Sequence, residues 1–104
     1  MCPPLPKEAI KDAEQDLKEA LTLLGLLSNP LRLRIALLLS KDEMCTCHLE
    51  SLLRAEQSLI SHHLREFKDL ALLNEKRIGR WRYYSLKDGR LKQMLCSIGL
   101  VQVK

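Results

Sequence analysis

The 104-residue chain is poor in aromatic residues, with only Phe67, Trp81, Tyr83 and Tyr84. Its core must therefore be built mostly from leucine and isoleucine. No apolar run approaches the length of about 18 residues that a membrane-spanning helix needs, so we expect no membrane segment. The N-terminus is proline-rich and then charged, unlike a secretory signal peptide. These absences favour one domain, alone or as a protomer of a small oligomer, located in the cytoplasm.

The sequence also lacks features that many enzymes need. It contains no glycine-rich phosphate loop and no pair of carboxylates convincingly placed for acid–base catalysis, so we expect no enzyme activity. The four cysteines are Cys2, Cys45, Cys47 and Cys96. Because cytoplasmic thiols are kept reduced, a disulfide framework is not expected.

Positive charge is concentrated in the second half of the chain. Residues 1–53 hold six Lys/Arg and eight Asp/Glu, a net charge of −2. Residues 54–104 hold eleven and five, a net charge of +6. This asymmetry indicates a polyanionic partner for the second half.

Two heptad-like seams lie near the ends of the chain, after an extended proline-containing arm over residues 1–6. The helix predicted over residues 7–27 carries the first seam, formed by Ile10, Ala13, Leu17, Ala20, Leu24 and Leu27. The helix predicted over residues 90–101 carries the second, formed by Leu91, Met94, Ile98 and Val101. The two seams can pair with each other or with a symmetry-related copy.

A second helix is predicted over residues 30–39. Asn29 is a suitable N-cap and Pro30 suits the first helical position. Its inward positions are Leu31, Ile35 and Leu38. Arg32 and Arg34 are expected to face outward.

Residues 46–70 are predicted to form a helix-turn-helix. A short helix from Thr46, a plausible N-cap, runs through Leu53, and a turn over residues 54–56 leads into a helix from Gln57. The apolar face of that helix is Ile60, Leu64, Phe67 and Ala71. Its opposite face is Ser58, His62, Arg65 and Asp69, with Ser61 at the edge.

Residues 72–86 change to strand-like sequence, with Gly79-Arg80 as the turn. This hairpin carries Lys76, Arg77, Arg80 and Arg82 against a single acid, Glu75. A basic hairpin directly after a helix-turn-helix is a wing. The predicted fold is therefore mainly α, a winged helix-turn-helix with about five helices and a two-stranded wing.

The second helix of such a motif reads double-stranded DNA in the major groove. Ser58, Ser61 and His62 are expected near base edges, and Arg65, Lys68 and Arg80 near phosphates. Arg77 and Arg82 flank the wing with their direction left open. His63 is expected to pack or to form an intramolecular hydrogen bond. The predicted DNA-contacting set is Gln57, Ser58, Ser61, His62, Arg65, Lys68, Arg77, Arg80 and Arg82.

Three segments resemble the ArsR–SmtB family of metal-sensing winged-helix repressors: SNPLRLRIALLL, MCTCHLESLL and QSLISHHLREFKDLALLNEKRIGRWRYYSL. The resemblance covers roughly residues 23–88, and its most specific pieces are SLISHHL and GRWRYY. It implies a homodimer, built from the first and last helices, that binds an operator and releases it when an effector binds.

Cys45-Thr46-Cys47 is the candidate effector site. Two thiols two residues apart make a poor disulfide but a good chelate for a thiophilic ion. Their place at the start of a helix favours thiolate, the form that binds metal. The expected ion is As(III), Cd(II) or Pb(II). His48 is a weak candidate ligand, because adjacent helical residues point about 100° apart.

The family resemblance suggests where a third ligand would come from. The arsenic branch can place a third thiol three residues after the second, where this chain has Glu50. Another branch uses thiols from the partner's N-terminal arm, which Cys2 could supply. The zinc branch needs ligands that Arg90, Val101 and Lys104 replace, although Asp88 fits. The expected metal ligands are Cys45, Cys47 and Cys2, and Cys96 is interpreted as a small hydrophobe.

Two other functions remain open at this point. The same fold could respond to thiol oxidation, with Cys45 or Cys47 pairing with Cys2 or Cys96. A helical dimer for protein interaction or metal buffering, with no operator, is the other alternative.

Overall fold

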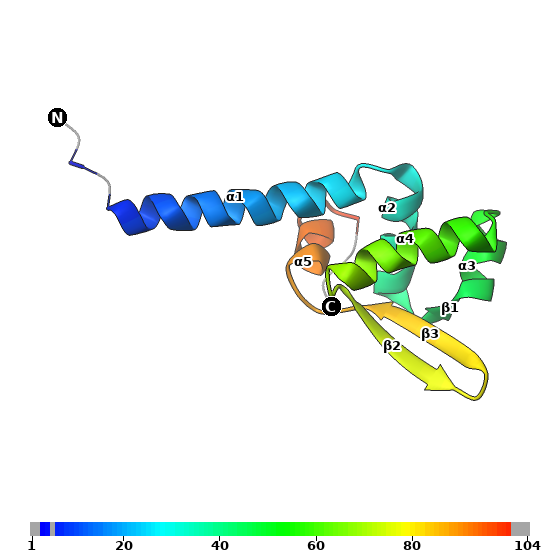
Figure 1. Ribbon diagram of the computed structural model, residues 1–104. Coiled ribbons are helices and arrows are strands. Elements are labelled where there is room, and N and C mark those ends of the chain that lie inside the picture. Colours follow the sequence, from blue (N-terminus) through cyan, green and yellow to red (C-terminus); the bar gives the residue numbers. More distant parts are fainter. Residues whose placement is uncertain (1–2, 5, 101–104) are drawn as a thin grey trace.

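The computed structural model describes residues 3–4 and 6–100, and it arranges them as a helical body from which one long helix projects (Figure 1). The expected metal ligand Cys2 and the expected seam residue Val101 lie outside the described residues. In chain order the elements are α1 (Lys7–Leu27), α2 (Pro30–Lys41), β1 (Met44–Cys45), α3 (Thr46–Leu53), α4 (Gln57–Asp69), β2 (Leu73–Ile78), β3 (Trp81–Leu86) and α5 (Arg90–Ser97). The described residues confirm the expected winged helix-turn-helix with five helices.

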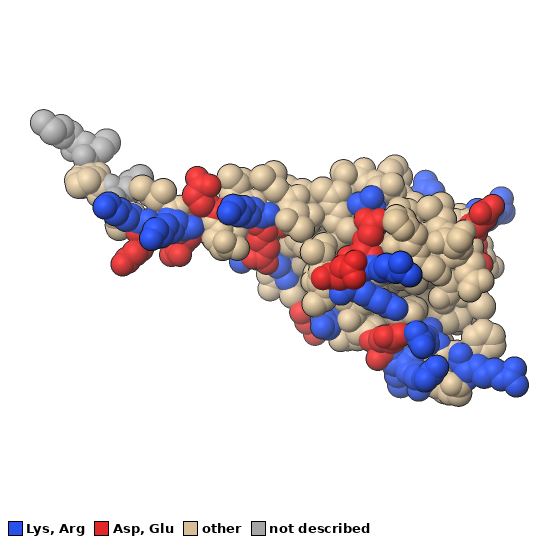
Figure 2. Space-filling view, in the orientation of Figure 1, with Lys and Arg blue, Asp and Glu red and all other residues tan. Residues whose placement is uncertain are grey.

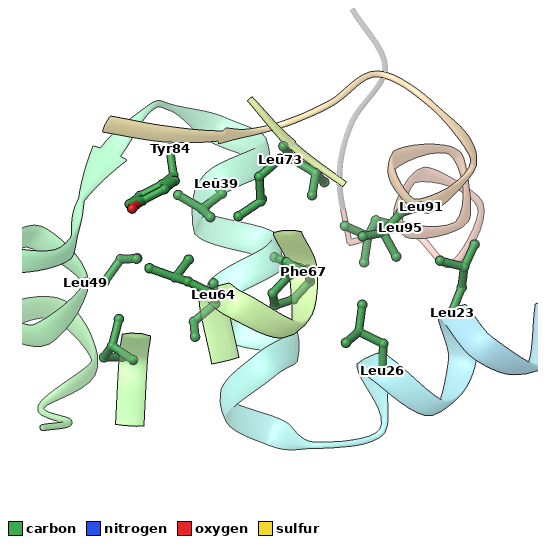
Figure 3. Close-up of a cluster of buried hydrophobic side chains, with 14 residues drawn as sticks. Leu23, Leu26, Leu39, Leu49, Leu64, Phe67, Leu73, Tyr84, Leu91 and Leu95 are labelled. Carbon is green, nitrogen blue, oxygen red and sulfur yellow. The ribbon is translucent and has the colours of Figure 1, made fainter. Parts of the chain in front are cut away.

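The core lies where α2, α3 and α4 meet the base of the wing (Figure 3). Phe67 and Ile60 of α4 and Ile35 of α2 are fully buried, and Tyr84 of β3 covers one side of the cluster. Leu91 and Leu95 of α5 pack beside Leu23 and Leu26 of α1 in the same cluster. As the composition predicts, most of these side chains are leucine and isoleucine.

Helix α2 begins as its sequence predicts. The Asn29 side chain accepts hydrogen bonds from the backbone N–H groups of Leu31 (2.9 Å) and Arg32 (3.2 Å), with Pro30 as the first helical residue. The buried positions of α2 are Ile35, Ala36 and Leu39. Leu38, expected to face inward, is only half-buried, because the helix turns its Ala36–Leu39 edge toward the core.

The β2–β3 hairpin confirms the expected two-stranded wing, and a short strand that was not expected, β1, extends the sheet to three strands in the order β1-β3-β2. Met44 and Cys45 form an antiparallel pair with Tyr84 and Tyr83 of β3. A two-residue strand is too short to produce an alternating pattern that sequence reasoning can detect. As a result, Cys45 lies in β1 and caps α3, whereas Thr46 was the expected cap.

Helix α5 ends at Ser97 instead of near Val101. Gly99 has a φ of +79°, and the N–H groups of Gly99 and Leu100 return to the carbonyl oxygens of Cys96 and Leu95, both at 3.1 Å. This bonding pattern closes the helix. Ile98 is therefore 63% exposed and does not extend the seam of α5 within the chain.

The seam of α1 makes little contact within the chain. Leu23 and Leu26 are the buried residues of this helix, while Ile10, Leu17 and Leu24 remain about half exposed. No single helix in the described part of the chain is long and apolar enough to cross a membrane. Helices α1 and α2 meet the length and composition limits only when taken together, and they bend by 99° between them.

Candidate nucleic-acid interface and thiol site

Helix α4 presents two distinct faces. Ile60, Leu64 and Phe67 are buried against the core, as the periodicity predicts. The exposed side of its first turns carries polar side chains, namely Gln57, Ser58, Ser61, His62 and Arg65. Arg65 has no ion-pair partner among the described residues. Short hydroxyl groups, an imidazole and a free guanidinium on one exposed face suit contact with base edges and phosphates.

A tight turn joins α3 to α4. Arg54 caps α3 in the left-handed conformation, with φ +52° and ψ +45°, and α4 begins three residues later at Gln57. Two short helices joined in this way, the second with an exposed polar face, form a helix-turn-helix. Leu49 of α3 is fully buried in the same core as Ile60, which fixes α3 against α4.

The hairpin of β2 and β3 forms a basic projection beside α4, visible at the lower right of Figure 2. Gly79, with a φ of +61°, occupies the first position of a two-residue turn between the paired residues Ile78 and Trp81. Arg77 and Arg82 lie directly opposite each other across the strands. Like charges at this position destabilise a hairpin, so the arrangement favours a polyanionic partner that neutralises their repulsion.

Two exposed residues of the expected DNA-contacting set, Lys68 and Arg82, already make contacts with other side chains of the protein. Lys68 donates a hydrogen bond to the Tyr84 hydroxyl (3.1 Å), lies 4.7 Å from the centre of the Tyr84 ring and 3.9 Å from Glu75. Arg82 Nη1 lies 3.7 Å from the same Glu75 carboxylate. Glu75 thus links the end of α4 to the wing through both cations. Arg77 and Arg80 are exposed and have no ion-pair partner among the described residues.

His63 is buried, as expected, and accepts a hydrogen bond from Arg32 Nε at 3.3 Å. The expectation that Arg32 faces outward was wrong, because its guanidinium also lies 3.3 Å from Glu66. Glu66 in turn contacts His62 Nε2 at 3.0 Å. Burial, followed by the charge of Arg32, lowers the pKa of His63. The His62-x-x-x-Glu66 spacing signals part of this network, whereas the link to α2 has no local signal.

Cys45 is buried and Cys47 is exposed, and both are free thiols. His48 lies closer to the pair than expected, with Nδ1 3.4 Å from Cys45 Sγ and 3.3 Å from the Cys45 backbone N–H nitrogen. The imidazole occupies the place that Glu or Gln takes in a capping box, three residues after the cap. This spacing was the signal that sequence reasoning missed.

The expectation that the helix start favours thiolate at this pair was wrong for Cys47. Desolvation, and then the neighbouring Cys45 thiol, raise the pKa of Cys47 above 9.0, despite its exposure and a backbone hydrogen bond that acts in the opposite direction. The raised pKa favours the thiol of Cys47 over its thiolate, so ion binding there would release a proton.

Among the described residues, no group of three potential ligands within 4.8 Å of one another includes the two thiols. In residues 3–4 and 6–100, the only group of three potential ligands within 4.8 Å of one another is His62, His63 and Glu66. Cys96 is half-buried on α5. The soft donor set of Cys45 and Cys47 fits a thiophilic ion, provided that a further ligand arrives from elsewhere, and the expected Cys2 lies outside the described residues.

These elements define a winged helix-turn-helix, the architecture of a DNA-binding regulator. The model of the family described as "Bacterial regulatory protein, arsR family" matches residues 29–75. The cadmium resistance regulatory protein CadC homolog of Staphylococcus aureus is 32% identical over 84 residues, which cover 80% of this chain and 69% of that protein. The chain belongs to the ArsR family of bacterial regulatory proteins.

Other similar proteins agree with this assignment. The transcriptional repressor SmtB homolog of Synechocystis is 35% identical over 68 residues, 65% of this chain. The match spans about half of that relative, 52% of its length. The structure of reduced HlyU from Vibrio cholerae superposes with a TM-score of 0.80 at 26% identity, covering 90% of this chain and 99% of that one.

Proposed function

We propose that the protein is a homodimeric repressor that binds a double-stranded DNA operator with α4 in the major groove and the β2–β3 wing against the neighbouring backbone. The observation that carries this proposal is the polar exposed face of α4 beside a wing whose Arg77 and Arg82 oppose each other. Arg65 and Arg80 are free to contact phosphates. Such a regulator would act in the cytoplasm, with the DNA.

Helix α1 is the proposed dimerisation surface. At about 100° per residue, Ile10, Leu17, Leu21 and Leu24 fall within one face, opposite the face of Leu23 and Leu26. These four side chains are between 49% and 59% exposed. Pairing this face in a second copy would bury them and set two α4 helices about 34 Å apart, in successive major grooves.

The proposed effector is a thiophilic ion, As(III), Cd(II) or Pb(II), bound by Cys45 and Cys47 with Cys2 of the partner subunit. The geometry suggests how the thiols act on the DNA surface. Cys45 pairs with Tyr83 of β3 and also caps α3, which packs against α4. Pulling the two thiols toward a shared ligand would therefore displace both wing and reading helix. A differential affinity of a few kcal/mol between the two dimer states suffices for release.

A mobility-shift series with the DNA upstream of the protein's own gene tests the DNA proposal. We expect binding that weakens steeply with salt, because phosphate contacts release counterions. His62→Ala combined with Arg80→Ala is expected to abolish the shift. The matched control is Lys7→Ala with Lys11→Ala, which removes two exposed cations of α1 away from this surface.

The result depends on the dimer staying intact, which sedimentation would verify. Unchanged binding by the His62/Arg80 variant would contradict the proposal. A folded dimer that shifts no DNA under any salt condition would instead favour a helical dimer without an operator.

A further inference from the structure

His62, His63 and Glu66 bring three potential ligand atoms together on α4. His62 Nε2 lies 3.0 Å, and His63 Nδ1 3.6 Å, from the same Glu66 oxygen, Oε1. All three atoms lie within 4.8 Å of one another. The set runs from surface to core, since the side chain of His62 is 64% exposed, that of Glu66 29% and that of His63 7%.

These spacings suit a single borderline ion. Nitrogen and oxygen ligands lie about 2.0–2.2 Å from zinc, so two ligands of one tetrahedral ion are roughly 3.4 Å apart. Two histidines and one glutamate are a ligand set that binds zinc in proteins, with solvent in the remaining position. The exposed side of His62 leaves that position open to water.

Without an ion, the side chain of Arg32 contacts two of these three residues, His63 and Glu66. Its Nε donates to His63 Nδ1 at 3.3 Å, and its Nη1 lies 3.3 Å from Glu66 Oε2. A guanidinium and a divalent cation cannot share the same lone pair. The Arg32 side chain is 24% exposed, so it has a path to solvent. An ion at this position would therefore have to displace Arg32, whose charge competes with that of the cation.

We propose that His62, His63 and Glu66 form a second ion site, selective for borderline divalent cations such as Zn(II), Co(II) or Ni(II) and independent of the thiols. Binding holds the His62 ring on Glu66 and releases Arg32 from α4. If α4 reads DNA as proposed above, this site lets a nitrogen-ligated ion reduce DNA affinity through the reading helix itself.

The probe is Co(II), added without DNA to a protein in which all four cysteines are replaced by serine. We expect uptake of one Co(II) per chain, with the visible absorption of nitrogen and oxygen ligation and no sulfur charge-transfer band. His62→Ala and Glu66→Gln should each weaken uptake at least tenfold. His48→Gln, the remaining histidine, is the matched control and should change nothing.

Arg32→Gln separates this site from a merely adventitious surface histidine. It should tighten Co(II) binding several-fold, because the competing cation is gone, and circular dichroism verifies that the variant is folded. No stoichiometric Co(II) in the cysteine-free protein, or equal uptake after His62→Ala, would overturn the proposal.

Because the Co(II) titration contains no DNA, its result does not depend on whether α4 binds DNA as proposed. In a second experiment, Zn(II) should lower the DNA affinity of the cysteine-free protein but not of its Glu66→Gln form. An equal loss of DNA affinity in the cysteine-free protein and in its Glu66→Gln form would overturn the proposed coupling between ion binding and DNA binding.

Discussion

His63 is the only buried polar or charged side chain in the described part of the chain, and we expect it to make the stability of the protein depend on pH. Its ring faces Arg32, Glu66 and His62. Desolvation is the main reason that its pKa is lowered from 6.5, and the positive charge of Arg32 acts in the same direction. Glu66 opposes this shift in part.

The free energy of unfolding should fall as the solution is acidified from pH 6.5 through the lowered pKa of His63. With a lowered folded-state pKa, the unfolded chain binds more protons near pH 6.5, so stability rises with pH there and is lost below it. Urea unfolding at about pH 7.5 and about pH 5 measures the difference. His63→Gln should reduce this pH dependence. An identical change in the free energy of unfolding between the two pH values in wild type and in His63→Gln would contradict this explanation.

For single residues, the sequence predicts which side chains of α4 are exposed and which are buried, because the helical period decides both. Ser58, Ser61 and His62 are exposed and Ile60 and Leu64 are buried, as expected. The position of Arg32 could not be predicted. Its partner His63 is 31 residues away, and a long flexible side chain satisfies a buried acceptor that only the tertiary fold creates.

Two helices end with the same hydrogen-bond pattern, but with different residues at the critical position. At the end of α4 the N–H groups of Ala71 and Leu72 return to the carbonyl oxygens of Lys68 (2.8 Å) and Phe67 (3.0 Å). Ala71 adopts a φ of +56° there, where α5 has Gly99 at +79°. A left-handed conformation is costly for a residue with a Cβ.

Ala71→Gly should therefore stabilise the protein. We expect a gain of about 1 kcal/mol in the free energy of unfolding. This corresponds to a rise of about 4–8 °C in melting temperature for a domain of this size, measured by calorimetry. The converse change, Gly99→Ala, should lower stability by a similar amount, since a Cβ at Gly99 would meet no atom within 4 Å and only the backbone strain remains. A destabilised Ala71→Gly variant would refute this reasoning.

The same elements show why helix ends and short strands limit sequence reasoning. The Gly79-Arg80 turn was predictable because the pair separates two strand-like runs. Strand β1 was not, since two residues carry no period, yet it places Cys45 beside Tyr83. The end of α5 was signalled by Gly99, but the apolar residues beyond it suggested a longer seam.

The whole molecule is elongated because α1 extends beyond the body (Figure 1). Its extents are 63 × 27 × 24 Å and its radius of gyration is 16.8 Å. A compact domain of about 100 residues has a radius of gyration of about 13 Å. The half-exposed leucines of this projecting helix are the physical basis of the proposed dimer.

Leu17→Glu should separate the dimer without unfolding the chain. A charge placed in the centre of an apolar helix pair costs several kcal/mol when buried, whereas Leu23 and Leu26 still anchor α1 to the core. Analytical ultracentrifugation should find a monomer that retains its helix content and binds DNA weakly. Gln15→Glu, which adds the same charge to a different face, should remain dimeric. Dimerisation that survives Leu17→Glu would place the interface elsewhere.

The release of DNA by a thiophilic ion is the central claim, and fluorescence anisotropy of labelled upstream DNA with the reduced protein tests it most directly. We expect arsenite or Cd(II) to lower the anisotropy of the wild-type complex to that of free DNA. The Cys45→Ser/Cys47→Ser protein should bind the same DNA and keep it when either ion is added, and Cys2→Ser should respond only weakly. A wild-type complex that neither ion dissociates, or a double-serine protein released as readily as wild type, would contradict the account.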